Sequence, residues 1–421
     1  MNQHTDSMRN PLRWITSLYL AEGLPFYAVA LVASLMFKSL RISNEQITHW
    51  TGFLGLAWVF KPLWSPLLEL SSNKKSTVIV CQWITGCAFG LVALALQLPS
   101  YFAACIAVFM LASLSAATHD IAADGLYILH LNEYQQARYA GWCGAFFNAG
   151  KFLSLGGLVI LAGYLESRYP VRTAWAIIFV LLAAIMLALG AYHWRAIPHT
   201  PAPAGSPMSA GETLRDVFSD FFRKPDIWLC IVFIILFRAG EAQVQTIAPL
   251  FLRDARELGG LGLTTGQIGS VYGTAGTLTF ILGSLGGGYF AAWLGLRRAL
   301  LPLVLAVNLP NLVFYFLSTQ MPTDLWVITA AISVEMLGYG FGFVGLILFI
   351  IQVLSVGKYC AAHYALASGI MQLGFVIFKV ISGDIQAALG YQHFFLWVLL
   401  SAVPVTLLVR RMPLPGAAPK Q

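Results

Sequence analysis

The sequence has little charge and lacks the cysteine patterns of metal sites and disulfide frameworks. Only 10% of its 421 residues are charged, whereas an ordinary soluble domain carries about 25%. The six cysteines are scattered through apolar segments without a CxxC pair, so neither a metal site nor a disulfide framework is predicted. Apolar residues make up 58% of the chain instead. This composition argues against soluble domains and is typical of a polytopic membrane protein.

Apolar segments long enough to cross a membrane recur along the whole chain. A spanning helix needs roughly 17 to 25 mainly apolar residues. The first such segment has no small-residue cleavage site after it, so we expect a retained helix rather than a signal peptide. We predict an all-α membrane protein with twelve transmembrane helices. They lie at about 13–37, 46–70, 77–98, 101–130, 135–164, 173–194, 226–252, 265–293, 298–319, 323–354, 361–388 and 391–410.

Basic residues are unevenly distributed between the predicted spans. The N-terminus, the even-numbered connections and the C-terminus hold fifteen Lys and Arg residues, and the opposite side holds six. Loops rich in Lys and Arg stay on the cytoplasmic side, so both termini are predicted to be cytoplasmic. The formal net charge of +7 therefore reflects topology and does not indicate nucleic-acid binding.

The longest loop divides the predicted spans into six and six. It opens with a proline-rich stretch that cannot form a regular helix and continues with apolar residues at helical spacing from Leu214 to Phe222. We predict an N-terminal six-helix half at 1–196, a cytoplasmic linker with a short amphipathic helix at 197–225, and a C-terminal six-helix half at 226–421. Two such halves joined by a long loop are the architecture of the major facilitator fold.

Charged residues inside the predicted spans each require a partner, water or a function, because a charge near the bilayer centre costs at least about 2.5 to 3.5 kcal/mol. At a rise of 1.5 Å per residue, Glu22, Lys61 and Asp120 all lie roughly 12 to 18 Å from the cytoplasmic ends of their helices. We therefore expect the first, second and fourth helices to share a charged cluster. The spans contain Glu22, Lys61, Asp120, Asp124, Lys151, Arg238, Glu241, Glu335, Lys379 and Asp384.

Asp120 and Asp124 are four residues apart and project from one face of their helix. Two ionised carboxylates this close repel in a low dielectric unless a cation such as Lys61 neutralises one of them. Such acids either take up and release a proton as a cavity faces each side, or belong to a fixed ion-pair network. We predict Asp120, Asp124 and Glu22 as proton-coupling residues that titrate as a set.

Cations deep in the spans are candidates for binding an anionic substrate. Arg238 and Glu241, three residues apart, either satisfy each other or leave the planar guanidinium for a substrate anion. Lys379 lies near the middle of its span and is a second candidate in the C-terminal half. The predicted substrate-binding residues are Lys61, Lys151, Arg238, Glu241 and Lys379.

Four motifs occur in order along the chain: "YLAEGLPF" (19–26), "WVFKPLWSPLLE" (58–69), "THDIAADG" (118–125) and "AHYALASGIMQLG" (362–374). Together they resemble the AmpG-like muropeptide permeases, which belong to the peptide and acetyl-coenzyme A transporter family of the major facilitator superfamily. The resemblance implies proton-driven import of N-acetylglucosaminyl anhydro-muramoyl fragments across the bacterial inner membrane, for peptidoglycan recycling. It places the family's acids at Asp120 and Asp124 and its lysine at Lys61. Relatives in that family carry siderophores or acetyl-coenzyme A, so a siderophore or another anionic small molecule is the alternative cargo.

Two other functional classes share some of these features. Intramembrane transferases also use aspartate pairs, to bind magnesium, but they need a second acidic cluster, and the other close acids here lie in the loop between 212 and 226. A transporter-like sensor would have the same sequence features. We predict a transporter rather than an enzyme, a monomer without metal or cofactor, whose partners are a small-molecule substrate, protons and the lipid bilayer.

Overall fold

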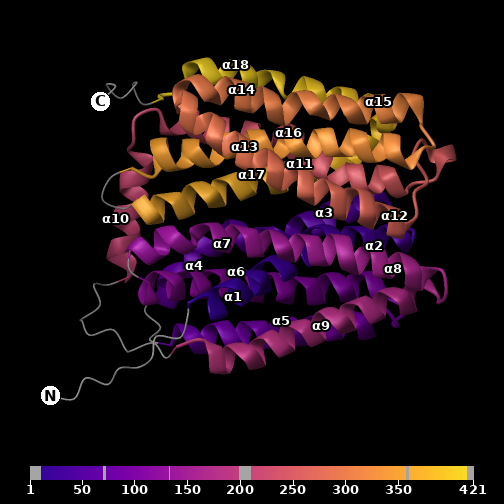
Figure 1. The fold of residues 1–421 in the computed structure, drawn as a ribbon, viewed down its shortest axis with the longest axis horizontal. Helices are drawn as coiled ribbons and strands as arrows, with labels where there is room; N and C mark the ends of the chain where they lie inside the picture. Colours follow the sequence, from indigo (N-terminus) through magenta and orange to yellow (C-terminus); the bar gives the residue numbers. More distant parts are fainter. Residues whose placement is uncertain (1–10, 70–72, 132, 199–209, 357–359, 415–421) are drawn as a thin grey trace.

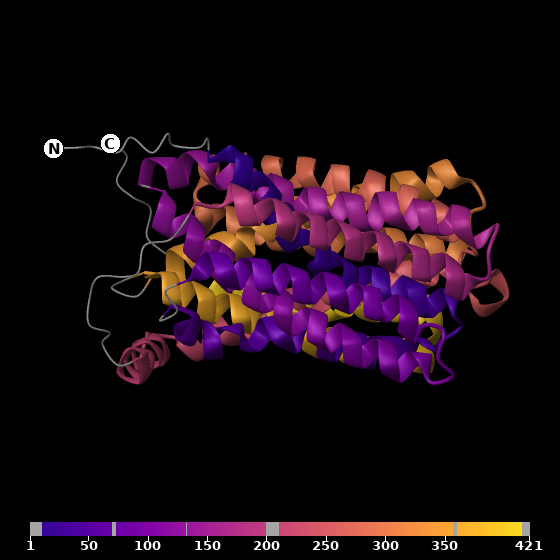
Figure 2. The same cartoon turned by 90° about the horizontal axis from the view of Figure 1, so that it is seen from below.

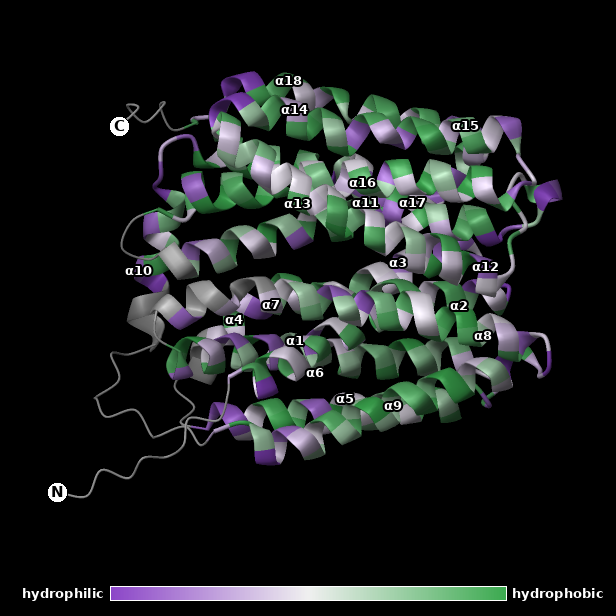
Figure 3. Ribbon diagram, viewed as in Figure 1, coloured by the Kyte–Doolittle hydropathy of each residue, from purple (hydrophilic) through white to green (hydrophobic). Residues whose placement is uncertain are grey.

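The computed structural model describes residues 11–69, 73–131, 133–198, 210–356 and 360–414. The regular secondary structure in these ranges is helical. A helix satisfies its backbone hydrogen bonds within the segment, as a hydrocarbon environment requires. Apolar residues predominate along the helices and hydrophilic ones gather toward the two ends of the molecule (Figure 3).

Two bundles of helices pack against each other along the length of the molecule (Figure 1). The first bundle contains α1 (Leu12–Tyr27), α2 (Ala33–Ser39), α3 (Asn44–Leu54), α4 (Leu56–Glu69), α5 (Lys74–Ala95), α6 (Tyr101–His130), α7 (Glu133–Lys151), α8 (Val159–Glu166) and α9 (Val171–Ala196). The second contains α11 (Ile227–Arg253), α12 (Thr265–Ile268), α13 (Gly276–Leu294), α14 (Leu296–Asn308), α15 (Leu312–Gln320), α16 (Leu325–Phe349), α17 (Cys360–Ser401) and α18 (Val403–Leu408). The chain limits predicted for the two halves stay a prediction.

The amphipathic helix α10 (Ala210–Phe222) lies crosswise at one end of the bundles (Figures 1 and 2). Its Phe221 side chain is buried and packs on the ring of His363 in α17, with ring centroids 5.4 Å apart. Contacts with α4 and α11 complete its packing. We call this end of the molecule the α10 end and the opposite end the distal end.

The helical segments that could cross a membrane do not match the predicted spans one to one. Among the described residues, ten helical segments are long and apolar enough to span a membrane. One of them, Ala362–Arg411, has 50 residues and contains Gly390, whose φ of 69° interrupts the helix. The segment predicted at 46–70 is divided into α3 and α4, which have 11 and 14 residues and are too short to count singly. The predicted total of twelve therefore stays a prediction.

Four π-helical segments lie within or at the end of long helical segments in the described part of the chain: η1 (Ala28–Val32), η2 (Phe152–Leu158), η4 (Gly269–Ala275) and η6 (Ile350–Leu354). Such wider turns shift the backbone hydrogen-bonding pattern and occur often at functional sites. Pro25, which has no N–H to donate, lies in α1 shortly before η1. Because η2 packs against η4, irregular backbone from both bundles meets at their interface.

Polar side chains join the two bundles at the distal end. Lys38 Nζ lies 2.6 Å from Asp254 Oδ1. Asn44 Nδ2 donates hydrogen bonds to Gln386 Oε1 at 2.6 Å and to the Tyr391 hydroxyl at 2.9 Å. The Tyr391 hydroxyl in turn donates to Asp254. These contacts close the distal end in the observed conformation.

Glycines bring the backbones of the two bundles together beneath those polar contacts. A Cβ atom on Gly163 would lie 2.2 Å from the backbone nitrogen of Gly266, and one on Gly273 would lie 2.1 Å from the carbonyl oxygen of Leu155. Side chains cannot fit at such distances, so these positions must lack a Cβ for this closure to form. We call Leu155, Gly163, Gly266 and Gly273 the glycine seal.

Gly273→Leu is expected to prevent the distal end from closing, because the new side chain would overlap the backbone of Leu155. The test uses a cysteine introduced at Thr265, which is 1% exposed, in a background without the native cysteines. This cysteine should become reactive toward an impermeant thiol reagent applied from the distal side. Gly288→Leu is the matched control, because a Cβ there meets nothing within 4 Å. Equal labelling of the two variants would contradict the sealing role.

Candidate functional site

A cavity of about 590 Å³ lies between the two bundles. Its walls come from α1, η1, α3, α4 and α7 of the first bundle and from α11, α13, α16 and α17 of the second. Thr51 and Lys379 line it toward the distal side, and Tyr364, near the start of α17, lines it toward the α10 end. The closed distal contacts and this position of the cavity fit a conformation that faces the α10 end.

Three of the predicted residues form a charged cluster in the first bundle. Lys61 Nζ lies 3.8 Å from Asp120 Oδ2, and the Trp58 indole N–H donates to the same oxygen at 2.8 Å. Glu22, which lines the cavity, interacts electrostatically with both Asp120 and Lys61. The structure thus brings together the three helices that the depth estimate predicted. The roles predicted for these residues stay predictions.

Asp124 has a different environment from Asp120. Asp120 is 5% exposed, whereas Asp124, one turn nearer the α10 end, is exposed. The Tyr19 hydroxyl donates to Asp124 Oδ1 at 3.1 Å. The two acids are therefore not equivalent, because water reaches Asp124 while protein shields Asp120.

Three predicted cations line the cavity. Lys151, which is 4% exposed, places Nζ 4.9 Å from the centroid of the Phe280 ring. The Arg238 guanidinium lies 4.8 Å from the centroid of the Phe375 ring. Lys379 Nζ donates to the carbonyl oxygen of Ala30 in η1 at 2.9 Å. Positive groups thus surround the cavity on both bundles.

Glu241 and Lys61 are held in ion pairs, and the substrate-binding role predicted for them stays a prediction. Glu241 Oε2 is 2.5 Å from Arg238 Nη1, and the Gln245 side chain donates to Oε1 of the same carboxylate. Neither Glu241 nor Lys61 is among the residues that line the cavity. Glu241 therefore orients Arg238 from behind, and Lys61 pairs with Asp120 beside the cavity.

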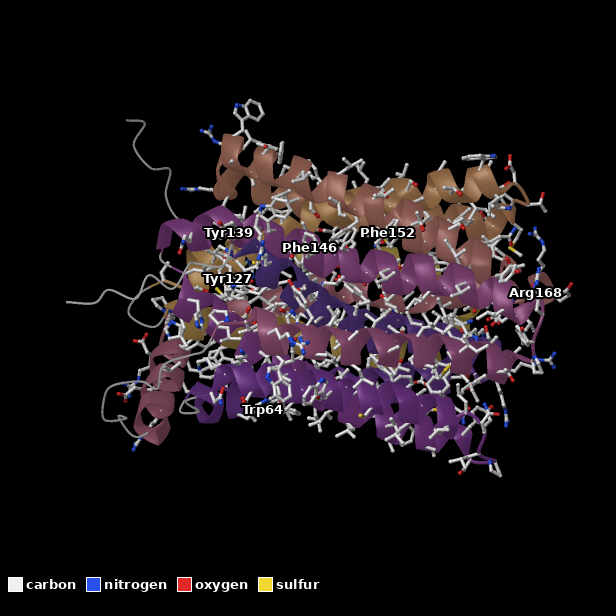
Figure 4. The ribbon with its side chains drawn as sticks, turned by 60° about the horizontal axis from the view of Figure 1, so that its bottom comes forward. Trp64, Tyr127, Tyr139, Phe146, Phe152 and Arg168 are labelled. Carbon is white, nitrogen blue, oxygen red and sulfur yellow. The ribbon has the colours of Figure 1, made fainter. Side chains whose placement is uncertain are left out.

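Aromatic side chains supply much of the remaining cavity wall. Phe26 and Trp58 meet edge to face with centroids 5.2 Å apart. Figure 4 shows the course of α7 and η2 through Tyr139, Phe146 and Phe152, which follow one another from the α10 end toward the distal end and are not themselves lining residues. Flat aromatic faces beside cations suit a ligand with both apolar ring surfaces and negative groups. The aromatic lining residues are Phe26, Tyr27, Trp58, Phe147, Phe280, Tyr339, Phe343, Tyr364 and Phe375.

Trp58 and Tyr19, which hydrogen-bond the acids, were not predicted as site residues. Trp58 precedes Lys61 by three residues, and Tyr19 precedes Glu22 by three. Positions three apart share a helix face, so this spacing was a usable signal. The polar cavity residues Gln245 and Gln372 carried no comparable pattern.

His119 belongs to a hydrogen-bonded group rather than to the acid cluster. Its Nε2 lies 2.9 Å from Gln82 Nε2, and Gln82 Oε1 lies 2.9 Å from His193 Nδ1. His193 reaches Ser17 Oγ at 2.9 Å. These contacts tie α1, α5, α6 and α9 together. Within the described ranges, no group of three His, Cys, Asp or Glu residues is arranged to hold a metal ion.

Comparison with known protein families identifies the superfamily to which this architecture belongs. The sequence model of the Major Facilitator Superfamily matches residues 15–383. The chain belongs to the major facilitator superfamily. As a member of this superfamily with its helices long enough to span a membrane, it is a multi-pass membrane transporter.

Individual relatives show which members of the superfamily the chain is similar to. The anhydromuropeptide permease of Escherichia coli strain K12 is 26% identical over 414 residues, covering 94% of this chain and 79% of the permease. The putative transporter AmpG 4 of Rickettsia conorii is 23% identical over 402 residues, covering 92% of each chain. The resemblance to AmpG-like permeases is thereby confirmed.

Solved structures confirm the fold. The nucleoside transporter NupG matches with a TM-score of 0.69 at 15% identity, over 96% of this chain and 98% of that one. A bacterial homologue of the human lysosomal transporter Spinster, in an inward-facing and unoccupied conformation, matches with a TM-score of 0.70 at 13% identity, over 96% and 95% of the two chains. At these identities the likeness concerns the fold alone.

Glu241→Gln is expected to destabilise this transporter by roughly 3 to 5 kcal/mol, because it leaves the Arg238 charge buried without its counterion. The double variant Arg238→Met with Glu241→Gln should recover most of that loss, since no charge is then unpaired. Thermal unfolding in detergent measures both. Asp384→Asn is the control, because its partner His49 is 2.7 Å away in an exposed pair. A Glu241→Gln variant as stable as this control would contradict the pairing argument.

Proposed function

We propose that this transporter is a proton-coupled importer of cell-wall muropeptides or related amino-sugar fragments across the bacterial inner membrane. The observation that carries the proposal is the cavity between the bundles, where cations and aromatic faces lie beside a cluster of acids. Relatives named as muropeptide permeases match more than nine-tenths of the chain. A siderophore or another anionic small molecule is the alternative cargo.

The proposed orientation places the α10 end in the cytoplasm. Arg297 lies at the start of α14, and Arg410 and Arg411 follow the end of α18. These helix ends lie at the α10 end (Figure 1), and basic residues favour the cytoplasmic side. We propose twelve crossings, with α3 and α4 forming one and α17 divided at Gly390 between two. The observed conformation would then face the cytoplasm.

The acid cluster supports proton coupling. Glu22 of α1 and Asp120 of α6 interact electrostatically, and repulsion between carboxylates is relieved when one of them binds a proton. Asp124, exposed nearer the α10 end, provides a group that exchanges protons with water on that side. A proton bound in the cluster can thus be released to the cytoplasm when the cavity faces it.

The cavity supports a carboxylate-bearing sugar as the cargo. Muropeptides carry carboxylates and sugar hydroxyls, and Lys151 and Arg238 present cations on opposite bundles. Arg238, held by Glu241, offers a planar donor set that matches a carboxylate. Binding a bulky anion between the two bundles would link their movements.

Membrane vesicles with the wild-type chain are expected to accumulate labelled anhydro-muropeptide under an inward pH gradient, and vesicles with Asp120→Asn are not. The amide of asparagine cannot bind and release a proton at this position. Asp124→Asn is expected to impair uptake in the same way, while Asp384→Asn, an exposed acid toward the distal end, leaves it unchanged. Free N-acetylmuramic acid and a ferric siderophore are assayed in parallel, with expression measured for each variant.

Two outcomes of this assay would contradict the proposal. Unchanged proton-driven uptake in both Asp120→Asn and Asp124→Asn would remove the coupling role of the acids. Accumulation of the siderophore without accumulation of either muramic compound would replace the proposed cargo with the alternative.

Lys151→Ala is expected to weaken binding of the carboxylate-bearing cargo more than binding of a neutral sugar analogue. The difference should be about tenfold or more, because a hydrogen bond to a charged group contributes about 1.5 to 3 kcal/mol. Competition against labelled cargo in detergent solution measures both affinities. Lys379→Ala is the comparison, since its amine is already engaged by the carbonyl of Ala30. Equal losses for the two ligands in Lys151→Ala would assign Lys151 a structural role.

A further inference from the structure

Glu335 is a deeply buried acid that the substrate cavity does not use. It lies in α16 and is 2% exposed. Its position, ten residues after Leu325 at the start of α16, is roughly 15 Å from the distal end of that helix. Tyr339, one turn nearer the α10 end, lines the cavity, whereas Glu335 does not. Its Oε2 atom is buried and has no hydrogen-bond partner among the described residues.

The groups around Glu335 come from three other helices. Lys151, at the end of α7, and Glu241, in α11, both interact electrostatically with it. Tyr272, in η4, also interacts with Glu335, and its buried hydroxyl has no hydrogen-bond partner among the described residues. Lys151, Glu241 and Tyr272 are the titratable groups among the described residues that interact electrostatically with Glu335.

Pairing among these groups leaves Lys151 as the counterion of Glu335. Arg238 and Glu241 lie 2.5 Å apart and neutralise each other within α11. Lys151 then remains as the cation for Glu335, but it belongs to the first bundle and Glu335 to the second. Within the described ranges no ion pair within 4.0 Å joins them, and the Lys151 amine lies over the Phe280 ring instead. The distance between Glu335 and Lys151 therefore depends on the position of the two bundles relative to each other.

The glycine seal is close along the chain to Lys151 and to Tyr272, which interacts with Glu335. Leu155 of the seal follows Lys151 by four residues, and Gly273 of the seal follows Tyr272. Separating Leu155 from Gly273, which closure requires to be in backbone contact, would open the neighbourhood of Glu335 to water from the distal side. The acid is thus placed to exchange a proton with one side of the membrane, and the Asp124 region with the other.

We propose that Glu335 and Lys151 form a second proton-exchanging pair, which couples the movement of the two bundles to proton uptake from the distal side. When the seal is open, the Glu335 carboxylate binds a proton from distal water and becomes neutral. When the carboxyl loses that proton, the resulting carboxylate attracts the Lys151 ammonium across the bundle interface. This inference rests on the proposed proton coupling of the transporter and adds the residue at which the proton enters.

The test compares proton-driven uptake with exchange in proteoliposomes, using the labelled N-acetylglucosaminyl anhydro-muramoyl disaccharide. A gradient of one pH unit supports about tenfold accumulation per coupled proton, because each tenfold ratio corresponds to about 1.4 kcal/mol. Glu335→Gln should lose this accumulation while it still exchanges external for internal disaccharide. Exchange needs the bundles to move but needs no net proton transfer. Thr277→Val, which removes another buried hydroxyl without a hydrogen-bond partner in α13, should keep both activities.

The outcomes separate this inference from the proposed function. If the wild-type chain shows no proton-driven uptake of the disaccharide, the proposed function fails. If the wild-type chain accumulates it and Glu335→Gln does so equally, the pair is overturned. Loss of exchange together with uptake in a stably folded Glu335→Gln variant also overturns it, because the residue then serves binding or movement generally.

A second variant applies if Glu335→Gln does not fold. Glu335→Asp keeps a carboxyl but withdraws it by one methylene from Lys151. The pH profile of disaccharide uptake is expected to shift, since the balance between the protonated acid and the ion pair changes with distance. A profile identical to that of the wild-type chain would overturn the proposal.

Discussion

The free-energy cost of a charge in hydrocarbon is the constraint on which the rest of this structure depends. Each such charge costs at least about 2.5 to 3.5 kcal/mol near the bilayer centre unless the protein satisfies it. Asp120 is met by Trp58 and Lys61, and Lys379 is met by the carbonyl of Ala30. These pairings join helices that are far apart in sequence. They lie where the two bundles meet, which places charged side chains in and beside the cavity.

The sequence could predict how deep each charged residue of the site lies in the membrane. The rise of a helix is constant, so counting residues from the helix ends was enough to bring Glu22, Lys61 and Asp120 together. The partner of Lys379 was not predictable, because it is a backbone carbonyl in the π-helical segment η1. The exposure of Asp124 depends equally on how neighbouring helices end, which spacing within one helix does not record.

The fold could likewise be predicted where long apolar runs determine it, but not where a single residue determines it. Long apolar runs predicted where helices lie, because burial of side chains in lipid needs no particular partner. A turn inside such a run is set by one residue, as at Gly390, where a positive φ interrupts a 50-residue segment. Hydropathy carries no information about backbone dihedral angles, so this break could not be predicted from it. The boundary between α3 and α4 is another local feature that composition alone leaves open.

The distribution of the ion pairs explains how such a molecule can move. A transporter must keep two conformations within a few kcal/mol of each other. The Arg238–Glu241 pair lies within one helix and the Lys61–Asp120 pair within one bundle, so separating the bundles leaves both intact. The pairs that cross between the bundles lie toward the distal end and have side chains 11% to 54% exposed, so water can replace part of their interaction. They are Lys38–Asp254, Glu166–Arg253 and His49–Asp384. The most deeply buried carboxylates of all these ion pairs, on Asp120 and Glu241, therefore keep their counterions when the bundles move apart.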